Sequence, residues 1–196
     1  MEKVVFFRTF EEEDAELIYQ WMNDDDLKRL SVGLNRRMSH SEALEWVRNK
    51  IPHNPYQVYW AVCARDTGRM IGYASLVNIH YINSSAETGA IMIADPDYRD
   101  GFAWLETALF LLEYAFERLG LNRVCGESIV GHKMSNLMEK LLFMQHEGIR
   151  RQAIFKNGRF YDLSCGALLK EEYFSHKEAG EYELMTMIRR LRSLKA

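Results

Sequence analysis

The spacing of hydrophobic residues changes several times along the chain and divides it into predicted helices and strands. Apolar residues recur about one helical turn apart in residues 11–30, 39–51, 102–121 and 134–143, which predicts helices. Stretches rich in β-branched and aromatic residues predict strands at 4–8, 58–64, 70–79, 86–94, 122–130, 144–155 and 158–169. The predicted order is βααβββαβαββ.

Turn and capping residues support these boundaries. Ser39 or Ser41 can cap the second predicted helix, and two prolines soon after residue 51 end it. The segments 66–69 and 157–158 are typical of hairpin turns. An antiparallel hairpin run followed by a strand, a helix and another strand predicts an α/β fold, with a mixed, mostly antiparallel sheet flanked by helices.

The chain of 196 residues is long enough for one well-buried domain, which we expect to span residues 1–175. Residues 176–196 form a predicted helical tail with one apolar stripe. We expect this tail to pack on the domain or to support a contact between two copies in a homodimer. The acids and bases of the tail are mixed, which argues against a membrane-binding helix.

Composition narrows the function. A net charge of −3 disfavours a mainly electrostatic nucleic-acid binder. The start of the chain contains no apolar run near the roughly 20 residues that a membrane helix needs, and it resembles no secretory signal, so we expect a cytoplasmic protein. The cysteines at 63, 125 and 165 are far apart and are expected to be core thiols, while the six histidines lack metal-binding spacing, so no metal is predicted.

The stretch from Ala86 to Leu121 carries the most chemical information, because a predicted strand leads through a loop into the longest predicted helix. The first amides of a helix have no partner within it and suit a phosphate. Gly101 and Ala103 would let an anion approach the backbone there. An ordinary loop before a core helix would look the same, so this fragment alone leaves both interpretations open.

Four segments follow one another in a fixed order: FRTFEEEDAELIYQWMNDDD, TGRMIGYASLVNIHYINSSAETGAIMIADPDYRDG, ALFLLEYAFERLGLNRV and MEKLLFMQHEGIRRQAIFKNGRFYDLSCGALLKEEY. Together they resemble the GNAT superfamily, particularly the branch of ribosomal-protein alanine acetyltransferases and related sugar and polyamine N-acetyltransferases. The resemblance implies a sheet splayed at a parallel strand pair, with acetyl-CoA in the opening. It also implies direct acetyl transfer to an amine, and backbone contacts from Met92 and Ile93 to the pantetheine arm.

The loop of this family is Gln/Arg-x-x-Gly-x-Gly/Ala, and two registers place it here. An ungapped match starts at Arg99 and puts Phe102 and Trp104 at the small-residue positions. If the helix contains one extra residue, the motif starts at Tyr98, and Gly101 and Ala103 stand at the small-residue positions. We prefer this second register. The expected coenzyme-binding residues are therefore Met92, Ile93, Arg99, Asp100, Gly101, Phe102, Ala103 and Trp104. The chain also departs from the family where Gly131, Met134 and Leu142 replace the usual Asn, Ser and Gly.

The resemblance implies that Glu87 assists deprotonation of the acceptor amine through water, although a merely solvated glutamate is the alternative. Ser135 is the expected proton donor to the thiolate, with His132, Tyr98 and Tyr161 as alternatives. Trp21, Asn23 and Asp24 are expected to bind the acceptor, which we expect to be a small molecule. A protein N-terminus as acceptor, and a catalytically silent binding protein with a degenerate coenzyme loop, remain alternatives.

Overall fold

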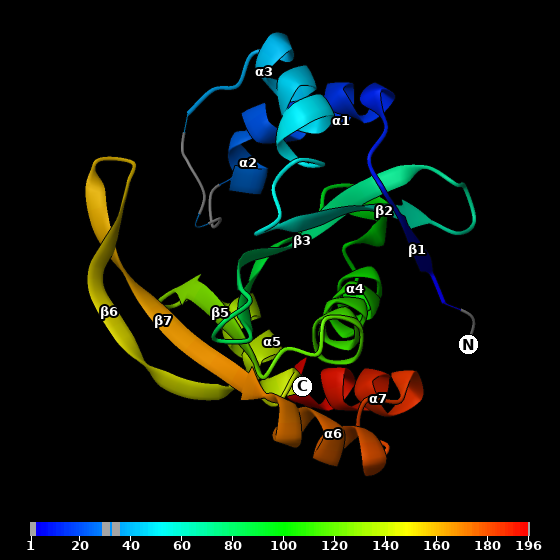
Figure 1. Ribbon diagram of the computed structural model, residues 1–196, viewed down its shortest axis with the longest axis vertical. Coiled ribbons are helices and arrows are strands. Elements are labelled where there is room, and N and C mark those ends of the chain that lie inside the picture. Colours follow the sequence, from blue (N-terminus) through cyan, green and yellow to red (C-terminus); the bar gives the residue numbers. More distant parts are fainter. Residues whose placement is uncertain (1–2, 29–31, 33–35, 196) are drawn as a thin grey trace.

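The structure is a computed structural model that describes residues 3–28, 32 and 36–195 (Figure 1). The side chains at 133–135, 138 and 195 are not described, so Ser135, the expected proton donor, lies outside the described side chains. The last two residues of the predicted helix 11–30 also lie outside the described range. Within the described ranges, no helix combines the length and apolar character needed to span a membrane.

The strands form a single seven-stranded sheet with the order β1-β2-β3-β4-β5-β7-β6. The strands are β1 (Val5–Arg8), β2 (Val58–Ala64), β3 (Met70–His80), β4 (Ser85–Ile93), β5 (Arg123–Ile129), β6 (Gln145–Lys156) and β7 (Arg159–Leu169). β4 and β5 run parallel, and the other neighbouring pairs run antiparallel. The predicted mixed sheet of an α/β domain is thus confirmed.

Helical segments cover both faces of this sheet. They are η1 (Glu12–Asp14), α1 (Ala15–Asn23), α2 (Asp25–Lys28), α3 (His40–Glu45), η2 (Trp46–Lys50), η3 (Pro96–Tyr98), α4 (Phe102–Glu113), η4 (Tyr114–Arg118), α5 (Lys133–Leu141), α6 (Lys170–Glu178) and α7 (Leu184–Lys195). Ser39 caps α3, with its hydroxyl accepting a hydrogen bond from the Glu42 amide. The predicted tail of residues 176–196 is not one helix: it holds the end of α6 and then α7, and Gly180 between them adopts a left-handed φ of 72°.

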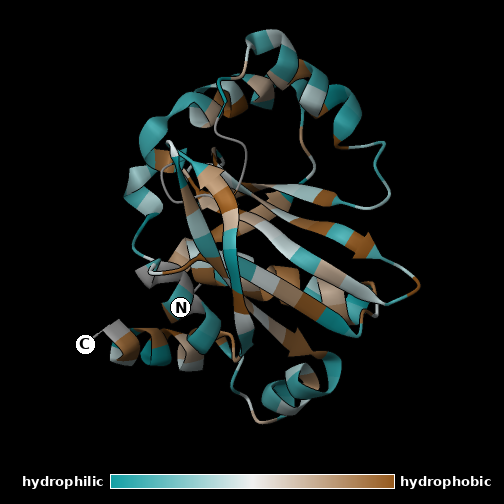
Figure 2. Ribbon diagram, turned by 90° about the vertical axis from the view of Figure 1, so that its left-hand side faces the viewer, coloured by the Kyte–Doolittle hydropathy of each residue, from teal (hydrophilic) through white to brown (hydrophobic). Residues whose placement is uncertain are grey.

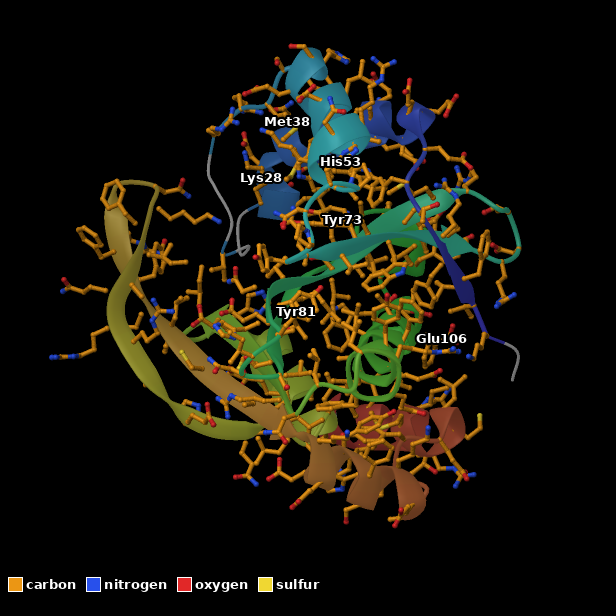
Figure 3. All side chains as sticks on the ribbon, viewed as in Figure 1. Lys28, Met38, His53, Tyr73, Tyr81 and Glu106 are labelled. Atoms are coloured by element: carbon orange, nitrogen blue, oxygen red, sulfur yellow. The ribbon has the colours of Figure 1, made fainter. Side chains whose placement is uncertain are left out.

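The core lies in two layers, one on each face of the sheet. On one face, residues of α4, α5 and α7 pack against buried side chains such as Ala86, Val124 and Leu168. On the other face, α1 and α3 cover β2 and β3, and Ile18 and Tyr73 lie in that layer (Figures 1 and 3). The strands in Figure 2 accordingly show brown hydrophobic bands interrupted by teal hydrophilic ones.

The sheet opens between β4 and β5. These strands are paired over three residues only, from Ser85 opposite Arg123 to Glu87 opposite Cys125, although both strands continue well beyond. At the opening, the Thr88 hydroxyl donates to the Cys125 carbonyl at 3.1 Å. A hydrogen bond from the Thr88 side chain therefore follows the last paired residues, at the point where the two strands diverge. The predicted splay of the sheet is confirmed.

A bulge in β4 contributes to this opening. The pairing with β3 shifts by a residue between Thr88 and Ile91, and the Ala90 amide donates to the buried Ser75 hydroxyl at 2.9 Å. Gly89 is required here, because a Cβ atom at this position would lie 2.3 Å from the Ser75 oxygen. The bulge therefore depends on one glycine and one buried serine.

The position of α4 is fixed from the side of β1. Both carboxylate oxygens of Glu106 accept hydrogen bonds from the Val4 amide, at 2.9 and 3.0 Å, and one of them accepts a third from Val5. Figure 3 shows Glu106 between α4 and β1. Phe7 stacks on Phe110 one turn further along α4, with ring centroids 3.9 Å apart. The start of α4 is therefore held against the sheet.

Candidate functional site

Glu87 lies at the base of the opening between β4 and β5, on their last paired rung. Its neighbour Ala86 is buried in the layer under α4, so the half-buried Glu87 side chain emerges on the opposite face. Asn78 donates a hydrogen bond from Nδ2 to Glu87 Oε2 at 2.8 Å. Asn78 has a left-handed φ of 50° in the irregular part of β3, which brings its amide to the carboxylate. Glu87 therefore has one side-chain partner, Asn78, on this face.

A polar group of side chains surrounds Glu87 on this face, and we call it the carboxylate face: Glu87, Cys125, Glu127, Arg150 and Cys165. Arg150 contacts Glu127 at 2.6 Å, and the Cys165 thiol lies 3.6 Å from the same carboxylate oxygen. Burial raises the pKa of Cys165, and the negative charge of Glu127 raises it further. These five residues supply two acids, two thiols and one cation, and Arg123 borders them on the same face, donating from Nε to the Cys125 sulfur at 3.2 Å.

Sequence reasoning missed most of the carboxylate face. Cys125 and Cys165 are half-buried on it, whereas Cys63 is the core thiol that was expected. The alternation of Arg123, Cys125 and Glu127 in a predicted strand was a usable signal, since residues two apart share one face. Nothing in the sequence pattern indicated that Arg150 of β6 would join this face, because its position beside Glu127 depends on how β5, β7 and β6 align.

The loop before α4 has the geometry of a helix start. Gly101 adopts a left-handed φ of 105° as the N-cap, and α4 begins at Phe102. Asp100 turns its carboxylate onto this start and accepts a hydrogen bond from the Phe102 amide at 2.9 Å. The amides of Ala103 and Trp104 follow in the first helical turn, where a helix has no acceptors of its own. One amide at this start is therefore already bound by a negative side chain.

The residues on either side of the loop hold it to the sheet. Arg99 donates from Nε to the Ile93 carbonyl at 3.1 Å and from Nη2 to the Ala94 carbonyl, so its guanidinium caps the end of β4. The Tyr98 hydroxyl donates to Asp66 in the β2–β3 turn at 2.7 Å, and this hydrogen bond raises the pKa of Tyr98. Tyr98 is therefore engaged away from the carboxylate face.

Other expected coenzyme residues lie around the opening. Met92 and Ile93 are on the part of β4 that has left β5, and they pair with β3 on the other edge. Phe102 and Trp104 pack their side chains against the core layer under α4. The Arg192 guanidinium of α7 lies 5.9 Å from the centre of the Phe102 ring.

The expected acceptor residues have mostly local partners. Asn23 binds the Tyr19 carbonyl and both backbone groups of Met38, which ties α1 to the segment before α3. Asp24 caps α2, with its carboxylate accepting from two amides of that helix. Trp21 lines a cavity of about 570 Å³ beside the end of β4. Among the described residues, Glu87 bonds to Asn78 and forms no hydrogen bond or ion pair with any of these three residues.

The remaining proton-donor alternatives lie near α5 and in β7. Gly131, with a left-handed φ of 87°, precedes α5, and the His132 amide donates to the Ile129 carbonyl. The Tyr161 hydroxyl accepts a hydrogen bond from Arg159 Nε, and the guanidinium lies 4.4 Å from the ring centre. Tyr161 is therefore paired with a cation.

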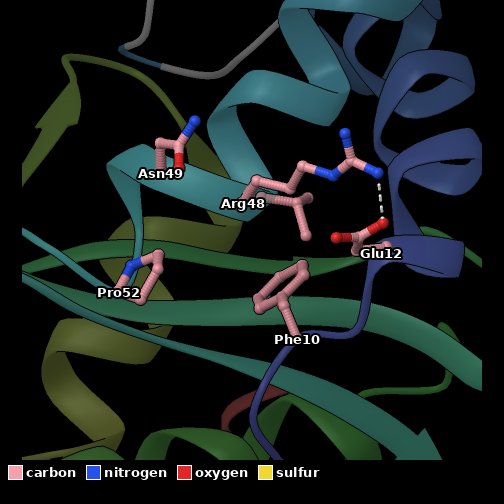
Figure 4. Close-up of a pocket in the computed structure, with 6 residues that line it drawn as sticks. Phe10, Glu12, Arg48, Asn49 and Pro52 are labelled. Carbon is pink, nitrogen blue, oxygen red and sulfur yellow. Dashed lines mark hydrogen bonds and ion pairs between the residues drawn. The ribbon is translucent and has the colours of Figure 1, made fainter.

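A second cavity, of about 370 Å³, lies between η1 and η2 (Figure 4). The ion pair between Arg48 and Glu12, at 2.5 Å, closes one side of it, and Phe10 and Pro52 line it. Neither Glu87 nor the loop before α4 lines either of these two cavities. We therefore build the candidate site on the opening of the sheet.

A sheet that opens at one parallel pair, with a helix start at the edge of the opening, is the arrangement that the resemblance in the sequence implied. The family described as the acetyltransferase (GNAT) domain matches residues 5–143, more than half of the chain. The protein belongs to this family and is an N-acetyltransferase.

Several known proteins are similar to this chain. The uncharacterized N-acetyltransferase YoaA of Bacillus subtilis (strain 168) is 26% identical over 168 residues, which cover 85% of this chain and 93% of that protein. The spermidine N(1)-acetyltransferase of Vibrio cholerae is 27% identical over 181 residues, covering 91% of this chain and 100% of that protein. A crystal structure of the V. cholerae spermidine N-acetyltransferase with CoA and spermine has a TM-score of 0.79 at 24% identity, covering 88% and 99% of the two chains, and shows the common fold.

Proposed function

We propose that this protein transfers an acetyl group from acetyl-CoA directly to a primary amine of a small molecule. The observation that carries the proposal is the opening between β4 and β5, with Glu87 at its base and the start of α4 at its edge. A thioester lying in this opening would reach the carboxylate face at the point where Glu87 is oriented by Asn78.

The coenzyme would be held by backbone groups. In this proposal the amides of Ala103 and Trp104 bind the pyrophosphate, and the left-handed Gly101 lets the phosphates approach. This geometry supports the register that places Gly101 at the central glycine. Met92 and Ile93 would bond the pantetheine arm from the free edge of β4. Arg99 would hold the end of β4 in place and add positive charge, whereas Asp100 would oppose the phosphates.

Glu87 would act as the proton acceptor. An ammonium must lose a proton before its nitrogen can attack the thioester carbonyl, and a carboxylate can receive this proton through water. The new C–N bond then forms as the C–S bond breaks, and the nitrogen gives up its second proton, which a donor–acceptor group relays to the departing thiolate. We assign this last step to Ser135. The products are the acetylated amine and CoA, with no acyl-enzyme.

A small amine is the favoured acceptor class because the carboxylate face carries two acids, Glu87 and Glu127. The V. cholerae relative of comparable length is described as acting on spermidine, which is consistent with a cationic acceptor. Acetylation of a protein N-terminus remains an alternative, and a homodimeric assembly remains a prediction.

Coenzyme binding is the decisive test, because the Asp100 carboxylate at the loop also fits a protein that has lost its coenzyme. Acetyl-CoA and CoA would be titrated calorimetrically into the full chain. We expect saturable binding of both, followed by release of free thiol when a panel of primary amines is added. No heat and no thermal shift at millimolar coenzyme would establish the silent binding protein instead.

A further inference from the structure

An ion pair crosses β7 on the carboxylate face. Glu127 belongs to β5 and Arg150 to β6, and β7 lies between these two strands in the sheet. Arg150 therefore reaches over Cys165, whose thiol also lies beside Glu127. The Arg150 side chain is 62% exposed, while the Glu127 side chain is 26% exposed. The cation is thus the more accessible partner of the pair.

The pair lies next to the proposed reaction centre. Glu127 is two residues beyond Cys125, the last residue of β5 that pairs with β4 at Glu87. One strand across and two residues along correspond to a Cα separation on the order of 8 Å, which a short diamine can bridge between two carboxylates. The hydrogen bond with Glu127 raises the pKa of Arg150, and the charge of Glu87 adds to this shift. Arg150 is therefore one cation near two acids.

A second ion pair crosses β7 in the same way and serves as an internal comparison. Arg123 of β5 forms two hydrogen bonds with Glu147 of β6. Arg123 lies at the closed end of the strand pair, opposite Ser85. This pair and the long β6–β7 ladder already hold β6 in place. Arg150 is therefore not needed as the anchor of this arm.

We propose that Arg150 is a specificity-determining residue. Its guanidinium pairs with the Glu127 carboxylate, to which a second ammonium group of the acceptor would otherwise bind. Such an acceptor must therefore displace Arg150 from Glu127. This inference rests on the proposed function and refines the acceptor to an amine with a further ammonium group. The attacking nitrogen would lie at Glu87 and the second ammonium at Glu127. Arg150 would then weaken the binding of such acceptors and of stray cations alike.

The test compares Arg150→Gln with Arg123→Gln, which removes the same charge at the closed end of the same face. Binding of 1,4-diaminobutane and of butylamine would be measured by calorimetry, with and without CoA, so that no turnover is required. We expect Arg150→Gln to lower the dissociation constant of the diamine roughly two- to fivefold, the range of an exposed ion pair. Butylamine binding should change less, whereas Arg123→Gln, whose side chain borders Cys125 but does not contact Glu127, should change the two dissociation constants by the same factor and leave their ratio unchanged.

Glu127→Gln provides the complementary measurement, because the diamine should then lose its advantage over butylamine. Equal shifts for Arg150→Gln and Arg123→Gln would reveal a general charge effect and overturn the proposal. Diamine affinity unchanged by Arg150→Gln, or no diamine binding to any variant, would overturn it as well. Failure of the proposed function is seen separately as an absence of acetyl-CoA binding, which does not involve Arg150.

Discussion

At the scale of the residue, Glu87 combines a fixed position on the last paired rung with a hydrogen bond from Asn78. Glu87→Gln keeps this bond and the size of the side chain but removes the proton acceptor. We expect the rate of acetyl transfer to fall by roughly 10²–10⁴-fold, with the dissociation constant of acetyl-CoA unchanged. Single-turnover kinetics alongside calorimetry measure both. An unchanged rate would assign Glu87 a structural role.

Asp100 allows a test of where the coenzyme phosphates lie. Asp100→Asn retains an oxygen that can accept from the Phe102 amide, but it removes a negative charge from the start of α4. We expect acetyl-CoA to bind roughly three- to tenfold more tightly, because like charges a few ångströms apart repel. Glu113→Gln is the matched control, since it removes the same charge at the far end of α4. If the two variants changed the affinity for acetyl-CoA equally, the pyrophosphate would not lie at the start of α4.

Only some of these residues could be found from the sequence. The place of Glu87 in a strand and of Gly101 at a helix start followed from the sequence pattern, while the roles of both residues came from the family resemblance and stay predictions. Asn23 and Asp24 were selected for their polarity, but in the folded chain their side chains bind nearby backbone. These bonds depend on where α1 ends and on which later segment packs beside it, and hydrophobic spacing does not specify this.

At the scale of the element, hydrophobic spacing predicted the strands well and the helix ends less well. The stretch 11–30 was predicted as one helix, yet Asp24 takes an extended conformation that separates α1 from α2 and caps the latter. The bulge in β4 was not predicted, because it depends on contact between Gly89 and Ser75 of the neighbouring strand. Contacts between neighbouring elements therefore determine features such as the β4 bulge, which the hydrophobic pattern within a single element does not specify.

The joint between α4 and β1 should be sensitive to a single oxygen. Glu106→Gln replaces one accepting carboxylate oxygen with an amide group that cannot accept from the Val4 amide. We expect a loss of about 1–2 kcal/mol in the free energy of unfolding, because charged hydrogen bonds in the interior are lost. Urea denaturation measures this loss. Exposed Glu113→Gln should stay within about 0.5 kcal/mol, and an equal loss there would contradict the assignment.

At the scale of the whole molecule, the C-terminal helix α7 is part of the hydrophobic core of the domain. α7 contributes Met187, Ile188 and Leu191 to the same core layer as α4 and α5. Arg190 also stacks on Phe143 after α5, with its guanidinium 3.7 Å from the ring centre. This packing favours a tail that docks on its own domain over one that is free to serve a partner. The sequence predicted the apolar stripe but could not say which surface the stripe would meet.

If α7 is part of the cooperative core, one truncation in it should destabilise the whole chain. Leu191 is 1% exposed, so Leu191→Ala should cost about 2–4 kcal/mol through lost burial and the cavity left behind. Leu194→Ala in the same helix changes a side chain that is 40% exposed and should cost well under half as much. Both are measured by urea unfolding followed by fluorescence and circular dichroism. A single transition that shifts for Leu191→Ala is expected, because α7 shares its buried contacts with α4. Two separate transitions, with only the minor one affected, would instead define residues 176–196 as an independent appendage.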